Sequence, residues 1–405
     1  MKKTGIALAV GALFVAPVAM AQSTVQIYGK VYPEMTWFKS SGATQPGGVT
    51  SNLVAQPTAA QAHDHKSRIS VDVSNSYLGF RGEEKLGGSL AAIWQIEQAT
   101  NFDTGADAFW ANRNSFLGLR GGFGTVKLGN MDTIYKEYGD QFSMFGISSG
   151  NFVSSSNALS TNGVGNSRLA RFHERAPNSI QYETPEFGDF TLGIQYSPDE
   201  MKGNPGRELD AAWWSYGIKY EAERLYVSVH QERRDDMFGG SSTATAVANP
   251  TGAGTAARSK DTATRLSVAF KLTPNHRLTG DIARLEYKES NQAAAGLFEK
   301  LEKTNWLVGW ESRWGGGPVR TGISYVKMNE GSCNLSGGVA CSTSGTDGSM
   351  VNLGAAYDFS KRTFVFALFS RLTNGESALF DNWSNGTPAR GADTTQFAVG
   401  VTHTF

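Results

Sequence analysis

The chain has 405 residues, with 37 basic and 37 acidic side chains, so its formal net charge is zero. Hydrophobic residues make up 40% and charged residues 18%, a balance that excludes a disordered chain and a nucleic-acid binder acting through bulk positive charge. The 47 glycines and 23 phenylalanines are typical of many short strands joined by tight turns. Beyond the N-terminus no apolar run approaches the roughly 18 residues of a transmembrane helix, so a helical membrane protein is excluded.

The N-terminal segment 1–21 has the three parts of a secretory signal peptide. Residues 2–3 are lysines, residues 5–18 are apolar but too few to span a membrane, and residues 19–21 form a small-x-small cleavage site. The alternative, an N-terminal core helix, does not require the three parts in this order. We therefore predict a signal peptide at 1–21, followed by a single exported domain at 22–405.

The rest of the chain consists of segments in which apolar and polar residues alternate with the period of a β-strand. The clearest segments, in chain order, are 25–38, 191–197, 264–272, 350–359 and 395–405. Within one of them, Leu266, Val268 and Phe270 alternate with Ser267 and Ala269. In a water-soluble sandwich the apolar face is the core, whereas in a membrane barrel it faces lipid and the polar face lines a lumen.

The connections between these segments distinguish the two folds. The short ones are 85–88, 121–124, 185–189, 274–275, 315–318 and 360–362. The long ones lie near 40–67, 132–177, 198–212, 237–262, 289–303, 330–349 and 374–394. About 16 strands with short turns at one rim and long loops at the other are typical of outer-membrane barrels, and so much loop is unusual in a soluble sandwich or solenoid. We therefore predict an all-β fold, a 16-stranded antiparallel transmembrane β-barrel with short periplasmic turns and long extracellular loops.

Three strings of residues resemble the Gram-negative trimeric porins of the general diffusion type found in beta-proteobacteria. The strings are 76–88, 112–129 and the terminus 399–405, and the resemblance continues over the whole exported domain in segment order. It implies a homotrimer in the outer membrane, in which each barrel encloses a water-filled pore for small hydrophilic solutes and ions. It also implies that the third long loop folds inward and that the terminal Phe405 is the signal for membrane insertion.

The candidate for the inward loop is 132–177, the longest strand-free stretch; the alternative is an ordinary solvated surface loop. Acids on this loop facing bases on the wall would create a transverse field at a constriction. The predicted constriction residues are Lys30, Arg81, Arg113, Arg120 and Lys127 on the wall, and Asp132, Glu137 and Asp140 on the loop. The strand alternation places Arg113 on the outer face, so this residue needs a kink or a position at the rim to line the pore. For each residue the alternative is a solvated or loop-bracing charge.

The sign of ion selectivity follows from these charges. Lys30, Arg81 and Lys127 predict a mild anion preference. The alternation also places Glu34, Asp72 and Glu83 on the lumenal face, so a cation-selective pore is the competing interpretation.

Three other functions compete with passive diffusion. A porin that prefers particular substrates, for instance organic acids, would differ in only a few pore residues. An outer-membrane adhesin needs a passenger or plug, for which the barrel and its loops leave no room, and a barrel enzyme needs a positioned Ser/His/acid set. The G-x-S-x-G string at 146–150 lies in a loop without the strand and helix that a nucleophile requires. We predict no enzymatic activity, no cofactor, no metal and no nucleic-acid partner.

The chain has two cysteines, Cys333 and Cys341, in a polar stretch. An even cysteine count in an exported chain favours one disulfide that closes a small loop. Metal binding is the weaker alternative, because two thiols do not complete a tetrahedral site and no histidine lies near them in the sequence.

Overall fold

A computed structural model describes most of the chain. The described residues are 24–44, 64–73, 75–106, 110–147, 151–164, 172–200, 211–237, 258–292, 294–382 and 388–405. The predicted signal peptide at 1–21 lies outside them.

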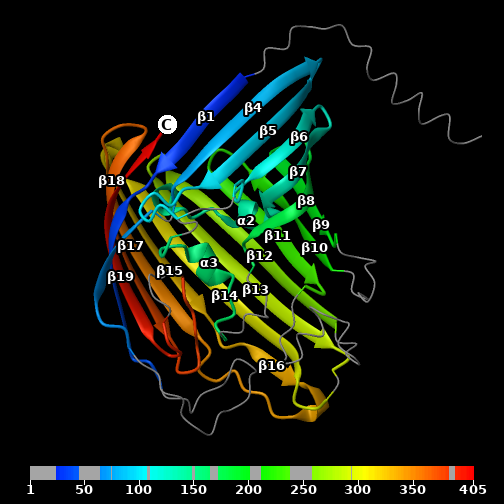
Figure 1. Ribbon diagram of the computed structural model, residues 1–405, viewed down its shortest axis with the longest axis vertical. Coiled ribbons are helices and arrows are strands. Elements are labelled where there is room, and N and C mark those ends of the chain that lie inside the picture. Colours follow the sequence, from blue (N-terminus) through cyan, green and yellow to red (C-terminus); the bar gives the residue numbers. More distant parts are fainter. Residues whose placement is uncertain are drawn as a thin grey trace, which may run out of the picture.

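The described residues form one antiparallel sheet of 19 strands, and the barrel closes where β19 pairs with both β1 and β2, while β1 pairs with β4 and β2 with β3 (Figure 1). The strands are β1 Thr24–Val31, β2 Glu34–Ser41, β3 Arg68–Asp72, β4 Tyr77–Gly87, β5 Leu90–Ala99, β6 Ser115–Gly121, β7 Gly124–Asp132, β8 Arg175–Glu183, β9 Phe190–Pro198, β10 Ala212–Glu221, β11 Leu225–Asp235, β12 Arg258–Thr273, β13 His276–Ser290, β14 Phe298–Arg313, β15 Val319–Met328, β16 Ser332–Leu335, β17 Gly348–Asp358, β18 Thr363–Asn374 and β19 Asp393–Thr404. The helices are α2 Ile134–Gly139 and α3 Ser155–Leu159, with 3-10 turns η2 Met144–Gly146, η3 Trp314–Gly316 and η4 Ser336–Gly338.

These 19 strands make 16 crossings of the barrel wall. β1 and β2 are halves of one crossing, interrupted at Pro33, which has no N–H to donate to a ladder. β3 and β4 are halves of the next, interrupted between Asp72 and Tyr77. β16 is a short strand within the β15–β17 connection. The predicted 16-stranded antiparallel barrel is therefore confirmed.

The two faces of the wall differ as the alternation predicts. On the outer face the apolar side chains of each strand are exposed, as at Val25 with 66% and Leu117 with 63% of their surface accessible. Other examples are Ile27, Ile69, Leu128, Ile194, Leu266, Ile282, Val308, Ile323, Leu353 and Val401. Aromatic pairs such as Tyr196 with Trp214, 4.2 Å between ring centroids, lie toward the ends of the strands, as in the aromatic girdles of transmembrane barrels.

The two rims also differ. Turns of a few residues join β4 to β5, β6 to β7, β8 to β9, β10 to β11, β12 to β13, β14 to β15 and β17 to β18 at one rim, and the longer connections join the remaining strands at the other (Figure 1). No helix in the described part of the chain is long and apolar enough to cross a membrane.

The terminal Phe405 completes the seam of the barrel. Its backbone exchanges two hydrogen bonds with Gly29 of β1, at 3.1 and 3.2 Å. Its ring lies where a Cβ on Gly29 would stand, 2.6 Å from the nearest ring carbon, so glycine is needed for this close approach. The role of Phe405 in membrane insertion stays a prediction.

Cys333 and Cys341 form a disulfide, with Cα atoms 5.9 Å apart. The disulfide closes a small loop at the rim with the long connections, where β16 extends the sheet beside β14. The predicted pairing is therefore present, and no cysteine remains for a metal site.

Candidate functional site

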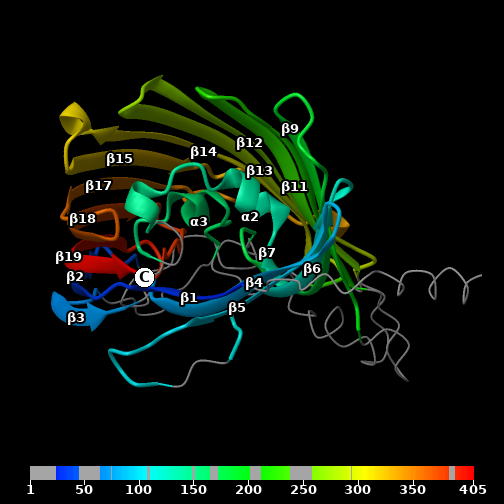
Figure 2. The same ribbon diagram turned by 90° about the horizontal axis from the view of Figure 1, so that it is seen from above.

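The connection between β7 and β8 lies within the ring of strands, and Figure 2 shows α2 and α3 there when the barrel is viewed from above. α2 begins after Thr133, whose hydroxyl accepts from the Lys136 N–H and donates to Glu232 of β11 at 3.0 Å. The N–H of Tyr135 donates to Ser215 of β10 at 2.8 Å. The connection therefore starts by binding polar side chains on the inner faces of β10 and β11.

Glycines on the wall make room for the apolar side chains of this connection. A Cβ on Gly309 of β14 would lie 2.6 Å from the ring of Phe142, and one on Gly354 of β17 would lie 2.5 Å from the sulfur of Met144. Phe142 and Met144 are both buried. The inner face thus encloses a hydrophobic core between the wall and the connection, in place of water.

Arg265 of β12 is the central anchor of the connection. Its side chain is fully buried and pairs with Asp281 of β13 at 3.1 Å. The guanidinium also donates to the carbonyl of Gly139 at 2.6 Å and to the hydroxyl of Ser156 at 3.1 Å. One buried cation therefore binds the wall, the end of α2 and the start of α3 together.

Further wall side chains bind carbonyl groups of the returning half of the connection. Asn352 of β17 donates to the carbonyl of Val153 at 3.1 Å, and Asn305 of β14 donates to that of Leu159 at 2.9 Å. The buried ammonium of Lys303 donates to the carbonyl of Asn162 at 2.6 Å. Because such buried carbonyls must be satisfied, these contacts fix the path of the chain.

A buried histidine links the two ends of the connection. His173 lies 2.6 Å from Asp140 through Nε2 and 2.8 Å from Asn157 through Nδ1. Burial lowers the pKa of His173, and Asp140 offsets only part of that effect. Burial alone would raise the pKa of Asp140, but the His173 ring together with the Lys136 and Arg265 cations outweighs burial and holds that pKa below its ordinary value. Asp140 is therefore a bracing charge, the alternative considered for it from the sequence.

The wall opposite α3, formed by β1 and β4–β7, carries a cluster of bases and aromatics. Arg113 pairs with Glu97 of β5 at 2.5 Å, and its guanidinium lies 4.9 Å from the ring centroid of Tyr77. Tyr28 donates to the same carboxylate at 2.9 Å. Arg113 lies before β6, which begins at Ser115, so the alternation along that strand does not fix the direction of its side chain. Its contact with Glu97 turns it inward.

Two predicted wall bases next to this cluster form no ion pair among the described residues. Arg81 donates to Gln26 at 2.9 Å, lies 4.7 Å from the ring centroid of Tyr28 and is exposed. Lys30 is mostly buried, and its ammonium lies 3.4 Å from the carbonyl of Gly146 in η2. Neither side chain therefore contacts a carboxylate of the described residues directly.

The remaining wall bases are paired. Lys127 lies 3.8 Å from Glu183 of β8, and Arg120 lies 2.7 Å from Glu83 at the rim with short turns. Arg120 is half exposed and lies near a turn, away from α2. The structure therefore does not bring Arg120 together with the other predicted bases.

The predicted acids of the connection have different surroundings. Asp132 contacts two cations, Lys136 at 2.9 Å and Arg175 at 3.2 Å. Glu137 is exposed and accepts from Gln181 at 3.3 Å, and it forms no ion pair in the described part of the chain. Of the three predicted acids, Glu137 alone presents a charge that is not countered by a contacting base.

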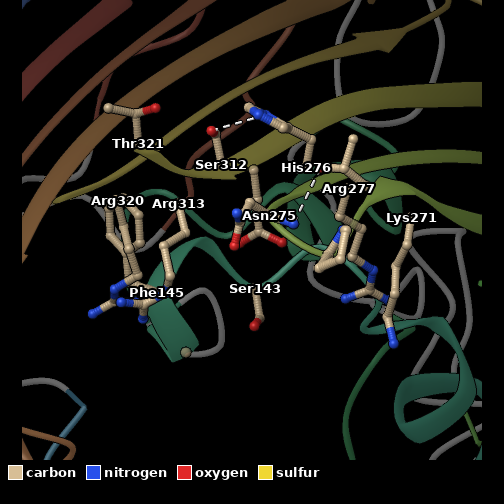
Figure 3. Close-up of a pocket in the computed structure, with 14 residues that line it drawn as sticks. Ser143, Phe145, Lys271, Asn275, His276, Arg277, Ser312, Arg313, Arg320 and Thr321 are labelled. Carbon is tan, nitrogen blue, oxygen red and sulfur yellow. Dashed lines mark hydrogen bonds between the residues drawn. The ribbon is translucent and has the colours of Figure 1, made fainter. Parts of the chain in front are cut away.

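A second basic cluster lies near the rim with short turns, beneath η2 (Figure 3). Lys271 and Arg277 are direct cross-strand partners on β12 and β13, and Arg313 and Arg320 are partners on β14 and β15. Like charges directly opposite one another are unfavourable in a sheet. Asp358 binds both Arg313 and Arg320, at 2.7 and 2.6 Å.

This cluster lines an open pocket of about 340 Å³, which we call the basic pocket. It is lined by Ser143, Phe145, Gly146, Lys271, Thr273, Pro274, Asn275, His276, Arg277, Glu311, Ser312, Arg313, Arg320 and Thr321. Figure 3 shows Lys271 beside Arg277, and Phe145 beside Arg320. The four basic side chains outnumber the carboxylate of Glu311 in the lining, so the pocket suits an anion.

The alternation of the strands does not predict the basic pocket. Lys271 and Arg320 each stand at a strand end beside a short turn, a position that strand parity alone does not place in a lumen. The signal available was that four bases at 271, 277, 313 and 320 flank two short turns. Among the described residues, no group of three or more His, Cys, Asp or Glu side chains could hold a metal ion.

Comparisons with known proteins place this geometry in context. A family model described as Gram-negative porin matches residues 7–377. The major outer membrane protein P.IB of Neisseria lactamica is 27% identical over 389 residues, which cover 93% of this chain and 95% of that protein. An anion-selective porin from Comamonas acidovorans has a TM-score of 0.68 at 19% identity, covering 95% of this chain and 100% of that one. OmpT of Vibrio cholerae has a TM-score of 0.61 at 16% identity, over 95% and 98% of the two chains. The two structures share the barrel fold.

Proposed function

The chain belongs to the Gram-negative porin family and is a multi-pass β-barrel of the outer membrane, and from this premise we propose that its pore prefers small hydrophilic anions. The resemblance drawn from 76–88, 112–129 and 399–405 is thereby confirmed. Passive diffusion through a water-filled channel is the activity of this family and fold, and the residues that control it are the subject of the proposal.

The observation that supports the anion preference is the charge balance of the inner face. Lys30, Arg81, Lys271 and Arg277 form no ion pair with any described residue, and the inner-face acids near them that lack one are Glu34, Glu137 and Glu311. In addition, Asp132 and Asp358 are each shared between two cations. Because a low-dielectric wall focuses the field of fixed charges, this surplus raises the local concentration of anions.

The proposed constriction lies between α2 and the wall formed by β4–β7. Arg81, Arg113 and Lys127 line the wall side, and Glu137 and the Asp132 cluster line the loop side. Arg120 belongs to the entrance at the short-turn rim and not to the constriction. The long connections are proposed to face the outside of the cell and the short turns the periplasm, and the working unit is proposed to be a homotrimer.

Planar-bilayer recording tests this function directly. The purified protein should insert in discrete steps of long-lived conductance, and the reversal potential in a potassium chloride gradient should have the sign of chloride preference. Migration of unheated protein on a gel should show a trimer that falls to one subunit after boiling. Stepwise conductance with a potassium preference would refute the charge argument while keeping the porin function.

A second candidate function, preference for organic acids, is favoured by the basic pocket. Two cross-strand pairs of like charge, with Arg277 also donating to Gln141 at 2.7 Å, form a site for a carboxylate or phosphate group. Small dicarboxylates should then reduce chloride current at millimolar concentration, and Arg277→Gln should weaken this block. Equal block of the wild type and the variant would remove the pocket from the permeation path.

A further inference from the structure

The outer face of the barrel carries an unusual row of lysines near the rim with the long connections. Lys260 of β12 is the cross-strand partner of Lys288 of β13, which in turn is the partner of Lys300 of β14. The strand alternation places all three on the outer face, together with the exposed Leu266 and Ile282. We call these three residues the lysine row.

The lysine row is electrostatically unfavourable in isolation. Side chains directly opposite in an antiparallel pair have Cβ atoms about 5 Å apart, and like charges at that spacing repel. Glu286 contacts Lys288, and Glu302 lies 2.8 Å from Lys300 and 2.9 Å from Arg284. Lys260 forms no ion pair in the described part of the chain, and its cross-strand partner Asp235 of β11 pairs instead with Arg233 at 2.8 Å. Three carboxylates therefore face five cations, and a positive surplus remains.

A hollow of about 410 Å³ lies at the lysine row. It is lined by Arg258, Ser259, Lys260, Lys288, Glu289, Ser290, Glu299, Lys300 and Asn334. Basic side chains outnumber carboxylates four to two in this lining. The hydroxyl and amide groups supply further donors, so the hollow has the chemistry of a site for phosphate groups. Figure 1 shows the strands that form it, β12–β14 with β16, meeting at the rim with the long connections.

The depth of the row in the membrane identifies the kind of partner. The lysine row lies six residues along the strands from an apolar row that contains Leu266, Ile282 and Trp306. This separation is about 20 Å along a strand, or about 15 Å along the membrane normal for strands tilted by about 40°. Arg284 is two residues from the apolar row, so cations extend from the level of lipid headgroups to well above it.

We propose that the lysine row with Arg284 binds the phosphorylated headgroup of a glycolipid in the outer leaflet. The charged sugars of such a lipid extend above the acyl chains, which the row of Leu266 and Ile282 contacts. Basic clusters beside an apolar membrane surface recognise anionic lipid headgroups in this way. The proposal rests on the outward orientation of the long connections and not on the path of conduction, because the lysine row is on the lipid side of the wall.

The test measures lipid binding to the purified full-length trimer in detergent by native mass spectrometry. The probe is diphosphorylated lipid A, compared with its monophosphorylated form and with inorganic phosphate as a competitor. The variant K260Q/K288Q/K300Q should bind the diphosphorylated lipid at least about tenfold more weakly, while K260R/K288R/K300R should bind it like the wild type. The single variant K288Q, which keeps two lysines, should show a smaller loss in the same direction.

A matched control removes three charges at the opposite rim, K85Q/K361Q/R362Q, and should bind like the wild type. Equal binding by K260Q/K288Q/K300Q and the wild type would overturn the proposal. Equal loss in the control would also overturn it, because bulk charge would then explain the binding. Competition by inorganic phosphate at the concentration of the lipid would assign the site to free anions instead. Bilayer conductance of the same preparations should be unchanged, which separates this result from a failure of the porin function.

Discussion

Replacing Arg265 by leucine should detach the β7–β8 connection from the wall. In the native structure the Arg265 guanidinium binds Asp281 on the barrel and the carbonyl of Gly139 at the end of α2. A Cβ on Gly139 would stand 2.6 Å from this guanidinium, so the two groups are in close contact. Leucine keeps the apolar volume of the side chain but offers no donor to either partner.

The magnitude follows from burial. Both side chains of the Arg265–Asp281 pair are fully buried, and removing one partner of a buried pair costs about 3–5 kcal/mol because the other charge is left without a partner. The lost hydrogen bonds to Gly139 and Ser156 come from a charged donor and contribute about 1.5–3 kcal/mol each. We expect the attachment of the connection to weaken by about 3 kcal/mol, which corresponds to about a hundredfold shift in the opening equilibrium.

Amide hydrogen exchange of the peptide 133–147 measures this opening. Exchange in Arg265→Leu should be about a hundredfold faster than in the wild type, while β17–β19 should exchange as before. Single-channel conductance should rise, because the connection no longer occupies a fixed position in the lumen. The double variant Arg265→Leu/Asp281→Leu removes the unpaired charge, so it should recover barrel stability but not the attachment.

Unchanged exchange of 133–147 in Arg265→Leu would refute the reasoning. It would mean that the contacts of Asn352, Asn305 and Lys303 hold the connection without Arg265. Recovery of the attachment in the double variant would also contradict it, because the hydrogen bond to Gly139 would then contribute nothing.

Three further predictions follow from the site. Replacing Arg81 and Lys127 with glutamate should shift the reversal potential toward cations, and an unchanged potential would remove both from the constriction. The pKa of His173 is lowered from 6.5 and that of Asp140 is lowered from 3.8 when the connection is attached, so both groups bind protons more readily in the detached state. Attachment of the connection should therefore weaken as the pH falls from about 6.5 to below 3.8. The protection factors of 133–147, which correct for the slower intrinsic amide exchange at low pH, should therefore fall on acidification in the wild type, and His173→Gln should show less of this fall between pH 7 and 5. Removing the disulfide by Cys333→Ser should leave the single-channel conductance unchanged but speed proteolysis of the loop 331–347. An altered conductance would place this loop in the pore.

The sequence by itself determined the barrel. Alternation along a strand depends only on neighbouring residues, and one face of each strand must meet lipid while the other meets the lumen. This is why the apolar face that contains Leu266 and Phe270 meets lipid, and why Lys30 and Arg81 lie on the inner face. The two cysteines were also paired correctly, because the sequence held only two.

Only the tertiary structure decided where the connections lie and which charges they cancel. Strand parity failed for Arg113, because the residue precedes its strand and turns inward to Glu97. It also could not show that Asp140 is bound by His173, 33 residues away. The basic pocket and the lysine row each combine residues from several strands, so they exist only once the register between neighbouring strands is fixed.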